Sequence, residues 1–314
     1  MYELMRMLID AAEGFVKENT TTSLPMISLA MCQRAQRLLD LMRSDMLEGD
    51  VGAFNRHLVK LYAAIPRSTE NARIAEYLKR KGFLEYSTET LDERIRFEQD
   101  FADCIQGAVE AALSGAEAKR TSDETKIDAM VGSFGLSIAD ADEGDLATIR
   151  KAMGDDSRKL IRAWKVSSKS SEERFASYIE RRCIRETKLL WHGSATSNFL
   201  SISTKGLSVA KAGGGMFGHG IYFAKDFDKS RGYCSVCNSR WRGGSDATAV
   251  LGLFEVATGR PLHLDDSRSD LRSGCGALRG YDSVWAHKGV HLHRDEFIVY
   301  DNDASSMRYI VETK

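Results

Sequence analysis

The spacing of apolar residues changes part-way along this chain of 314 residues, and that change limits what the chain can fold into. Up to about residue 115 they recur at steps of three and four, the spacing of amphipathic helices. From about residue 155 onward they gather in short β-rich runs. The length suits two domains better than one. We therefore expect an α+β chain: an N-terminal all-α helical bundle followed by a mixed, mostly antiparallel β domain.

Amphipathic helices are expected to build the first part. The first is predicted to be capped by Ser23, with Pro25 in its first turn, and to end at Gly49. Two more are predicted to begin near Val51 and near Leu91. The sequence therefore predicts a bundle of at least three helices.

The second part is predicted to hold many strands and few helices. Two short helices are expected, at 171–183 and 196–205. This pattern favours a largely antiparallel sheet over a doubly wound parallel one. The predicted strands cover residues 159–166, 187–193, 220–224, 248–256, 281–286, 296–301 and 307–312.

The two halves carry opposite charge. Residues 1–150 hold 18 Lys and Arg against 26 Asp and Glu, whereas residues 151–314 hold 26 against 19. The net charge of the whole chain is −1, which argues against a protein that mainly coats nucleic acid. The basic second half is the better host for an anionic ligand.

Membrane and secretory features are not expected. No apolar run reaches the roughly 18 residues of a membrane helix. Glu3, Arg6 and Asp10 interrupt the apolar N-terminal stretch, so it does not resemble a signal peptide. The six cysteines are scattered, and a chain with a full core has no need of disulfides. We expect an intracellular protein.

Cys234 and Cys237 form a C-x-x-C pair that could suggest zinc. A structural zinc site takes four ligands. No second Cys or His pair follows within 25 residues, and Cys275 and His263 are distant candidates. We therefore predict two ordinary thiols and no metal.

The glycine-rich segment 212–220 does not fit a nucleotide-binding loop. It lacks the Gly-Lys-Ser/Thr ending of a phosphate loop, and a strand follows it where a dinucleotide fingerprint would open a helix. Two interpretations remain: a glycine-rich hairpin, or a loop that folds over a ligand beside the next strand.

Three polar residues stand in predicted strands: His192, Tyr222 and Glu296. Each alone is more often structural than functional. Their surroundings, LLWHGSATSNFLSISTKGL, GIYFAKDFDKSRGYC and DEFIVYD, together resemble the catalytic domain of the poly(ADP-ribose) polymerases. The resemblance covers residues 134–314 and implies an ADP-ribosyltransferase fold there. Residues 1–130 are more loosely similar to the helical regulatory domain of the DNA-damage-responsive members.

The resemblance implies that NAD+ is the co-substrate, cleaved at its nicotinamide–ribose bond. His192 matches the histidine that hydrogen-bonds a ribose hydroxyl on the adenosine side. The Gly193 backbone and the Ser230 hydroxyl match the groups that hold the carboxamide. Tyr222 and Tyr233 match the tyrosines that flank the nicotinamide ring.

Two further residues, Ser194 and Asn198, match the NAD-binding segment, and Asn198 matches a polar contact on the adenosine side. Glu296 matches the glutamate that binds the nicotinamide ribose, favours the developing positive charge and orients the acceptor hydroxyl. With His192 and Tyr222 it completes the catalytic triad associated with chain elongation. The resemblance thus implies a poly-ADP-ribosyltransferase.

Two positions depart from the family pattern. Gly215 stands where a close relative has a loop tyrosine, and Ser208 stands where an arginine could contact the adenosine side. Two alternatives therefore stay open: a mono-ADP-ribosyltransferase, and a catalytically silent module that binds NAD or ADP-ribose.

The resemblance also implies partners and regulation. Protein acceptors are expected, the protein itself among them. Activation by DNA would require a module or partner that is not evident in this chain. The helical domain is expected to be autoinhibitory. The implied location is the nucleus in a eukaryote, or the cytoplasm and nucleoid in a microbe.

Overall fold

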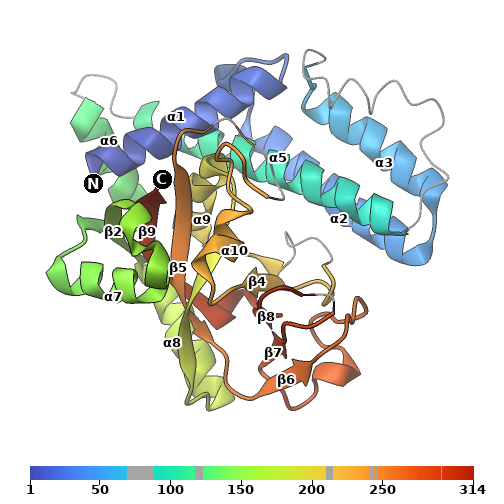
Figure 1. Cartoon of the computed structure of the whole chain (residues 1–314). Coiled ribbons are helices and arrows are strands. Elements are labelled where there is room, and N and C mark those ends of the chain that lie inside the picture. Colours follow the sequence, from blue (N-terminus) through green and yellow to red (C-terminus); the bar gives the residue numbers. More distant parts are fainter. Residues whose placement is uncertain (69–87, 117–122, 210–214, 241–243, 245, 291) are drawn as a thin grey trace. The chain divides into compact units, whose positions relative to one another are not determined.

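The computed structural model describes residues 1–68, 88–116, 123–209, 215–240, 244, 246–290 and 292–314 (Figure 1). The chain divides into two compact units. The helical unit is Arg6–Met130, and the β unit is Val131–Lys314 together with Met1–Met5. All the site residues predicted from the sequence lie in the β unit.

Two sheets form the frame of the β unit. Every neighbouring pair in the first, five-stranded sheet is antiparallel. In the second, four-stranded sheet only β6 and β7 run parallel. The first sheet has the order β1 (Leu136–Asp140), β2 (Leu160–Ser168), β9 (Ser305–Thr313), β5 (Ala249–Ala257) and β3 (Thr187–Gly193). The second has the order β4 (Ile221–Phe223), β8 (Glu296–Val299), β7 (Ser283–Ala286) and β6 (Pro261–Leu264).

This architecture confirms the expected α+β class with mixed, mostly antiparallel sheets. Each of the seven predicted strands has a counterpart, and β3 has the predicted bounds. Strands β1 and β6 were not predicted. The helices of the β unit are α7 (Glu143–Met153), α8 (Lys169–Arg182), α9 (Phe199–Lys205) and α10 (Phe227–Arg231).

Sequence spacing also missed helix α7. Its start has clear local causes: the Asp142 side chain accepts from the Asp145 backbone N–H at 2.8 Å, and Asp145 Oδ2 accepts from the Asp142 backbone N–H at 3.3 Å. This reciprocal capping satisfies two amide groups at the helix start. The predicted helix at 196–205 opens with a 3-10 turn, Thr196–Asn198, before α9 begins.

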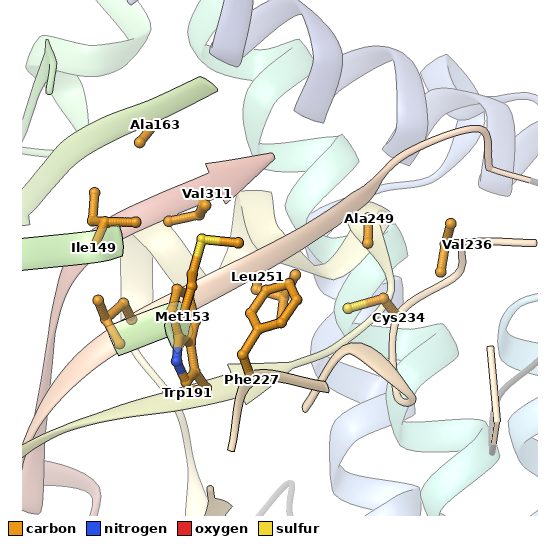
Figure 2. Close-up of a cluster of buried hydrophobic side chains, with 11 residues drawn as sticks. Ile149, Met153, Ala163, Trp191, Phe227, Cys234, Val236, Ala249, Leu251 and Val311 are labelled. Atoms are coloured by element: carbon orange, nitrogen blue, oxygen red, sulfur yellow. The ribbon is translucent and has the colours of Figure 1, made fainter. Parts of the chain in front are cut away.

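A buried apolar cluster lies against one face of the five-stranded sheet and joins it to α7 and α10 (Figure 2). Trp191 of β3 is fully buried there, with its ring 5.3 Å from Phe227 of α10 in an edge-to-face arrangement. Its indole N–H donates to the Ala152 carbonyl at 3.2 Å. The end of β3 and the short helix α10 are therefore held together by buried contacts.

The helical unit is built from helices that bury one apolar face each. None of the helices within the described ranges is long and apolar enough to cross a bilayer. Helix α1 was not predicted, although Leu8, Ala12 and Val16 recur at steps of four and are buried. Helices α2 (Leu29–Glu48), α3 (Val51–Ala64) and α5 (Thr88–Ala116) lie wholly in this unit, whereas α1 (Tyr2–Asn19) begins and α6 (Asp123–Ser133) ends in residues of the β unit.

The start of the second helix differs from the prediction. Leu24–Met26 forms a separate 3-10 helix that contains Pro25, and Ser23 makes no side-chain cap bond. The cap is Ser28, whose hydroxyl accepts from the Met31 backbone N–H at 3.3 Å. The cap predicted at Ser23 is therefore wrong, whereas the predicted end at Gly49, which has φ +75°, is confirmed.

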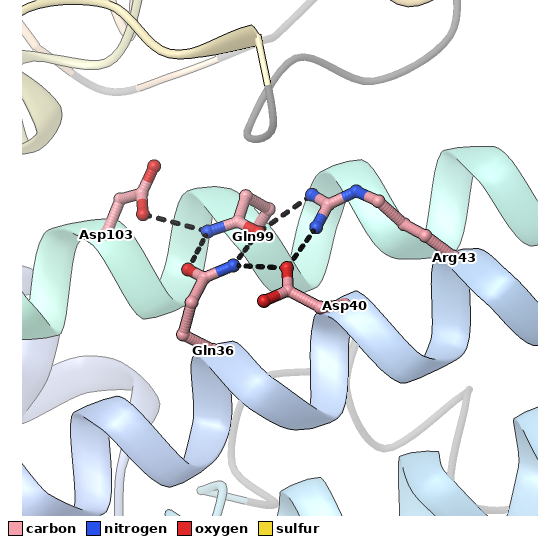
Figure 3. Close-up of polar contacts among 5 residues, drawn as sticks. All are labelled: Gln36, Asp40, Arg43, Gln99 and Asp103. Carbon is pink, nitrogen blue, oxygen red and sulfur yellow. Dashed lines mark hydrogen bonds and ion pairs between the residues drawn. The ribbon is translucent and has the colours of Figure 1, made fainter.

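A polar layer joins α2 and α5 (Figure 3). Gln99, fully buried on α5, donates to Gln36 Oε1 at 2.8 Å and to Asp103 Oδ1 at 2.9 Å. Arg43 donates to Gln99 Oε1 at 2.8 Å and to Asp40 Oδ1 at 3.1 Å. Burial lowers the pKa of the Arg43 guanidinium. The side-chain amides of Gln36 and Gln99 therefore fix how these two helices align.

Glu98, the residue before Gln99 on α5, forms a buried ion pair with Arg67. Arg67 Nη2 donates to Glu98 Oε2 at 2.5 Å, and the two side chains are only 2% and 0% exposed. The Tyr62 hydroxyl donates to Glu98 Oε1 at 2.7 Å, and the Arg67 guanidinium lies over the Phe101 ring. Glu98 thus compensates a cation that has no access to water.

Removing this carboxylate should destabilise the helical unit. We expect Glu98→Ala to lower the free energy of unfolding by about 3–5 kcal/mol, because Arg67 then stays buried without a counter-charge. Urea unfolding followed by circular dichroism measures this change. Glu48→Ala, at the exposed end of α2, is the control and should change stability by less than about 0.5 kcal/mol. Equal effects of the two substitutions would contradict the assignment.

Candidate active site

Three adjacent strands bring the predicted triad together. The backbone N–H of Trp191 donates to the Ala224 carbonyl at 2.8 Å, and the Ala224 N–H donates back at 3.0 Å. These bonds join the end of β3 to the residue after β4, and β4 pairs with β8 along its length. The structure therefore places His192, Tyr222 and Glu296 on neighbouring strands, although they are far apart in the sequence.

The His192 ring is fixed by its neighbours. Its Nδ1 lies 3.0 Å from the Tyr222 carbonyl oxygen, which can only accept, so Nδ1 carries the proton. The ring also packs at centroid distances of 5.7 Å from Phe223 and 6.0 Å from Phe254. In the neutral ring Nε2 is then the acceptor nitrogen, which suits a hydroxyl ligand.

The Tyr222 hydroxyl holds the glycine-rich loop. It accepts from the Phe217 N–H at 3.0 Å and donates to the Gly218 carbonyl at 2.8 Å. The Tyr300 hydroxyl donates to the Phe217 carbonyl at 2.5 Å, and burial raises the pKa of Tyr300, which keeps that donor protonated. The described end of the loop is therefore fixed to the sheet, while its residues 212–214 lie outside the described residues.

Gly193 is required by a close approach of two backbones. A Cβ at this position would lie 1.8 Å from the carbonyl oxygen of Ser230. The Ser230 hydroxyl donates to the Trp191 carbonyl at 3.1 Å. Its lone pairs are thereby directed as acceptors, which suits the N–H₂ group of a carboxamide.

The other predicted NAD-binding residues lie around the same strand end. The buried Asn198 side chain donates to the Ser194 hydroxyl at 3.0 Å, so these two residues act as one polar unit. The Tyr233 side chain follows α10 and is 42% exposed, which leaves ring surface available for stacking.

Glu296, at the start of β8, forms a buried ion pair that sequence analysis did not find. Lys229 Nζ lies 2.7 Å from Glu296 Oε1, and the two side chains are 7% and 9% exposed. The same ammonium donates to the Arg294 carbonyl at 3.1 Å. Lys229 therefore compensates the buried carboxylate charge and fixes one of its oxygens. In the sequence, nothing but its place beside Ser230 distinguishes Lys229 from the exposed Lys225.

The C-x-x-C cysteines lie in different environments. Cys234 is fully buried, with Sγ 3.3 Å from the Val250 carbonyl oxygen, whereas Cys237 is exposed. Among the residues that the structure describes, no three His, Cys, Asp or Glu side chains are grouped so that they could hold a metal ion.

Residues 145–288 match the family described as "Poly(ADP-ribose) polymerase catalytic domain". This part of the chain is similar to the catalytic domain of the poly(ADP-ribose) polymerases. The matched range contains every predicted NAD-binding residue and ends before Glu296. The placement of Glu296 beside the matched residues therefore rests on the pairing of β8 with β4 and β7.

Similar curated proteins include both poly- and mono-transferase names. The chain is 35% identical to human "Protein mono-ADP-ribosyltransferase PARP3" over 127 residues, 40% of this chain and 22% of that protein. It is 38% identical to "Poly [ADP-ribose] polymerase" of Drosophila melanogaster over 181 residues, 48% of this chain and 17% of that protein. It is 30% identical to "Poly [ADP-ribose] polymerase 1" of Caenorhabditis elegans over 191 residues, 50% of this chain and 19% of that protein. The matched regions thus span about a fifth of each relative.

The structure gives a reason for one departure from the polymerase pattern. A Cβ at Gly215 would lie 2.4 Å from the Tyr222 hydroxyl oxygen. A side chain at 215 would therefore require the Tyr222 hydroxyl or the loop itself to shift. Ser208 lies just before the residues outside the described range, and the structure gives no reason for its departure.

Breaking the buried ion pair should be measurable without any activity assay. We expect Lys229→Met to lower the free energy of unfolding by about 3–5 kcal/mol, because Glu296 remains buried without a counter-charge. Lys225 is exposed and lies just before α10, so Lys225→Met should change the free energy of unfolding by less than about 0.5 kcal/mol. Guanidinium unfolding followed by tryptophan fluorescence compares the two. Similar stability of both variants would contradict the buried pair.

Proposed function

We propose that this protein is an NAD+-dependent ADP-ribosyltransferase that modifies protein acceptors, itself included, and extends the product into poly(ADP-ribose). The observation that carries the proposal is the placement of His192, Tyr222 and Glu296 on three adjacent strands, with the Glu296 carboxylate held by Lys229. A module that only binds ADP-ribose has no need of a buried, charge-compensated carboxylate at this place.

The proposed reaction replaces one bond at the anomeric carbon of the ribose. The bond to the nicotinamide nitrogen breaks, its electron pair leaves with nicotinamide, and an acceptor oxygen bonds to the same carbon. The proton of the acceptor hydroxyl passes to Glu296 and then to solvent. The developing positive charge on the sugar is favoured by the Glu296 carboxylate, whose Oε1 is fixed by Lys229 and whose Oε2 is the oxygen assigned to the substrate.

The remaining residues are proposed to hold NAD+ in the ground state. His192 presents an acceptor nitrogen to a ribose hydroxyl, because its Nδ1–H is bound to the Tyr222 carbonyl. The Gly193 backbone and the Ser230 hydroxyl take the carboxamide, and the partly exposed Tyr233 ring stacks on the nicotinamide ring. The Tyr222 hydroxyl contributes by holding the loop turn rather than by a bond to the substrate.

Mono-ADP-ribosylation is the second candidate, favoured by the similarity to a human protein with that name. Radiolabelled NAD+ incubated with the chain and resolved on a gel separates the possibilities. A ladder supports polymerisation and a single labelled band supports mono-transfer. No label contradicts both and leaves the binding module.

Glu296→Gln should leave NAD+ binding nearly intact and reduce transfer by roughly 10²-fold or more, because the amide keeps the shape but not the charge or basicity. Calorimetry measures binding, and the radiolabel assay measures transfer. Since Lys229 loses its counter-charge in this variant, the folded fraction is measured first. Glu180→Gln, exposed on α8, is the matched control. Full-length polymer from Glu296→Gln would exclude the assigned role.

We also propose that the helical unit restrains activity. The acidic first half and the basic second half attract each other, and salt screens that attraction. The resemblance to the poly(ADP-ribose) polymerases implies a helical domain that opposes NAD+ entry until it loosens. If the closed form dominates, apparent NAD+ affinity falls with the competent fraction.

A truncation that starts at Gly135 should therefore lower the apparent KM for NAD+. Steady-state NAD+ consumption at matched salt compares it with the full chain, after circular dichroism has established that the truncation is folded. The same assay with and without broken DNA tests DNA-dependent activation. Equal or lower activity of a folded truncation would exclude the restraint.

A further inference from the structure

A closed ring of hydrogen bonds ties α10 to the segment that leads into β8. Asp226 Oδ1 accepts from the Lys229 backbone N–H at 2.9 Å, and Asp226 Oδ2 accepts from Arg294 Nε at 2.8 Å. Lys229 Nζ then donates to the Arg294 carbonyl at 3.1 Å. The ring thus joins three residues through backbone and side-chain atoms of two separate segments. Glu296 lies two residues beyond it.

Asp226 has two tasks in this ring, one for each carboxylate oxygen. As the N-cap of α10 it satisfies an amide at the start of a helix of only five residues. A helix this short has little stability of its own, so its geometry depends on its cap and its packing. With its second oxygen Asp226 holds the Arg294 side chain. The start of α10 and the approach to β8 therefore have a common anchor.

The Lys229 ammonium connects this anchor to the catalytic carboxylate. Its acceptors are the Arg294 carbonyl and Glu296 Oε1, which lie two residues apart in one segment. A shift of Arg294 away from α10 would move the carbonyl from Lys229 and leave the ammonium with the carboxylate alone. The position of Glu296 relative to Ser230, which follows Lys229 on α10, therefore depends on the ring.

Stability alone does not explain the ring. The Asp226 and Arg294 side chains are 34% and 57% exposed. Ion pairs at such exposed positions contribute about 0–1 kcal/mol to folding. The Asp226–Arg294 pair matters because it holds the Arg294 backbone, whose carbonyl accepts from Lys229.

We propose that Asp226 and Arg294 are positioning residues for transfer, which act through Lys229 on the Glu296 carboxylate. The inference rests on the proposed ADP-ribosyltransferase function. Neither residue touches NAD+ in this proposal, and the ground-state contacts assigned to His192 and Tyr233 lie outside the ring. Loss of the ring should therefore lower kcat and leave the KM for NAD+ nearly unchanged.

The substitutions separate the two tasks of Asp226. Asp226→Ser keeps a good helix cap but is too short to reach Arg294. Arg294→Ala removes the same contact from the other side and leaves its backbone carbonyl in place. We expect each to reduce kcat about tenfold, since small displacements of a catalytic group have effects of up to about 10²-fold. The double variant should be no worse than either single variant, because both remove one interaction.

Arg294→Lys is the conservative rescue, because an ammonium can still reach Asp226. It should recover most of the kcat lost in Arg294→Ala. The matched control is Arg174→Ala, which breaks another exposed Arg–Asp pair, from Arg174 Nε to Asp303 Oδ1 at 3.1 Å. That control should keep kcat within about twofold of the unsubstituted chain, as expected for an exposed pair.

Steady-state transfer from radiolabelled NAD+ gives kcat and KM for the full-length variants, and thermal unfolding gives the folded fraction at the assay temperature. The inference is overturned if Arg294→Ala matches Arg174→Ala in kcat, if the losses of the two single variants multiply in the double variant, or if the folded fraction accounts for the loss. An unsubstituted chain that transfers no ADP-ribose overturns the proposed function together with this inference. An active chain with unaffected variants overturns the inference alone.

Discussion

A single buried residue, Trp191, joins the parts of the β unit on which the site depends. Its backbone N–H and carbonyl both bond to Ala224, which attaches the second sheet to the first. The same carbonyl accepts from the Ser230 hydroxyl, and the indole reaches Ala152 and packs against Phe227. Because the side chain and the backbone of this one residue connect two sheets and two helices, the residues directly after Trp191 have little freedom.

Each unit also contains a buried ion pair. Both units bury a carboxylate against a cation: Glu98 against Arg67 in the helical unit, and Glu296 against Lys229 in the β unit. Such pairs gain little net stability over apolar residues, but they are severely disturbed when one member is lost. In the helical unit the pair joins the segment after α3 to helix α5. In the β unit it holds the Glu296 carboxylate in a defined place, largely away from water.

The sequence predicted what depends on local pattern and on family resemblance. Apolar runs located the strands, and the motifs around His192 and Glu296 selected residues that the structure places on neighbouring strands. It did not predict what depends on distant partners. Lys229 is an ordinary lysine in the sequence, because its partner lies on another strand. Helix α7 was not predicted, although Leu146, Ile149 and Met153 recur at steps of three and four and Asp142 caps its start. Ser28 and Ser23 are equally plausible caps in the sequence. Ser28 is the cap because Leu24–Met26 forms a separate 3-10 helix and α2 begins only at Leu29.

The contact between Gly193 and Ser230 has a consequence for inhibitors. A compound that bound to the backbone of residue 193 would contact a surface that substitution can scarcely alter, since a Cβ at this position would lie 1.8 Å from the Ser230 carbonyl oxygen. Drug resistance by substitution at this position would damage the scaffold that carries the site. Substitutions that confer resistance would have to occur at nearby exposed positions, such as Tyr233, where a change disturbs the fold less.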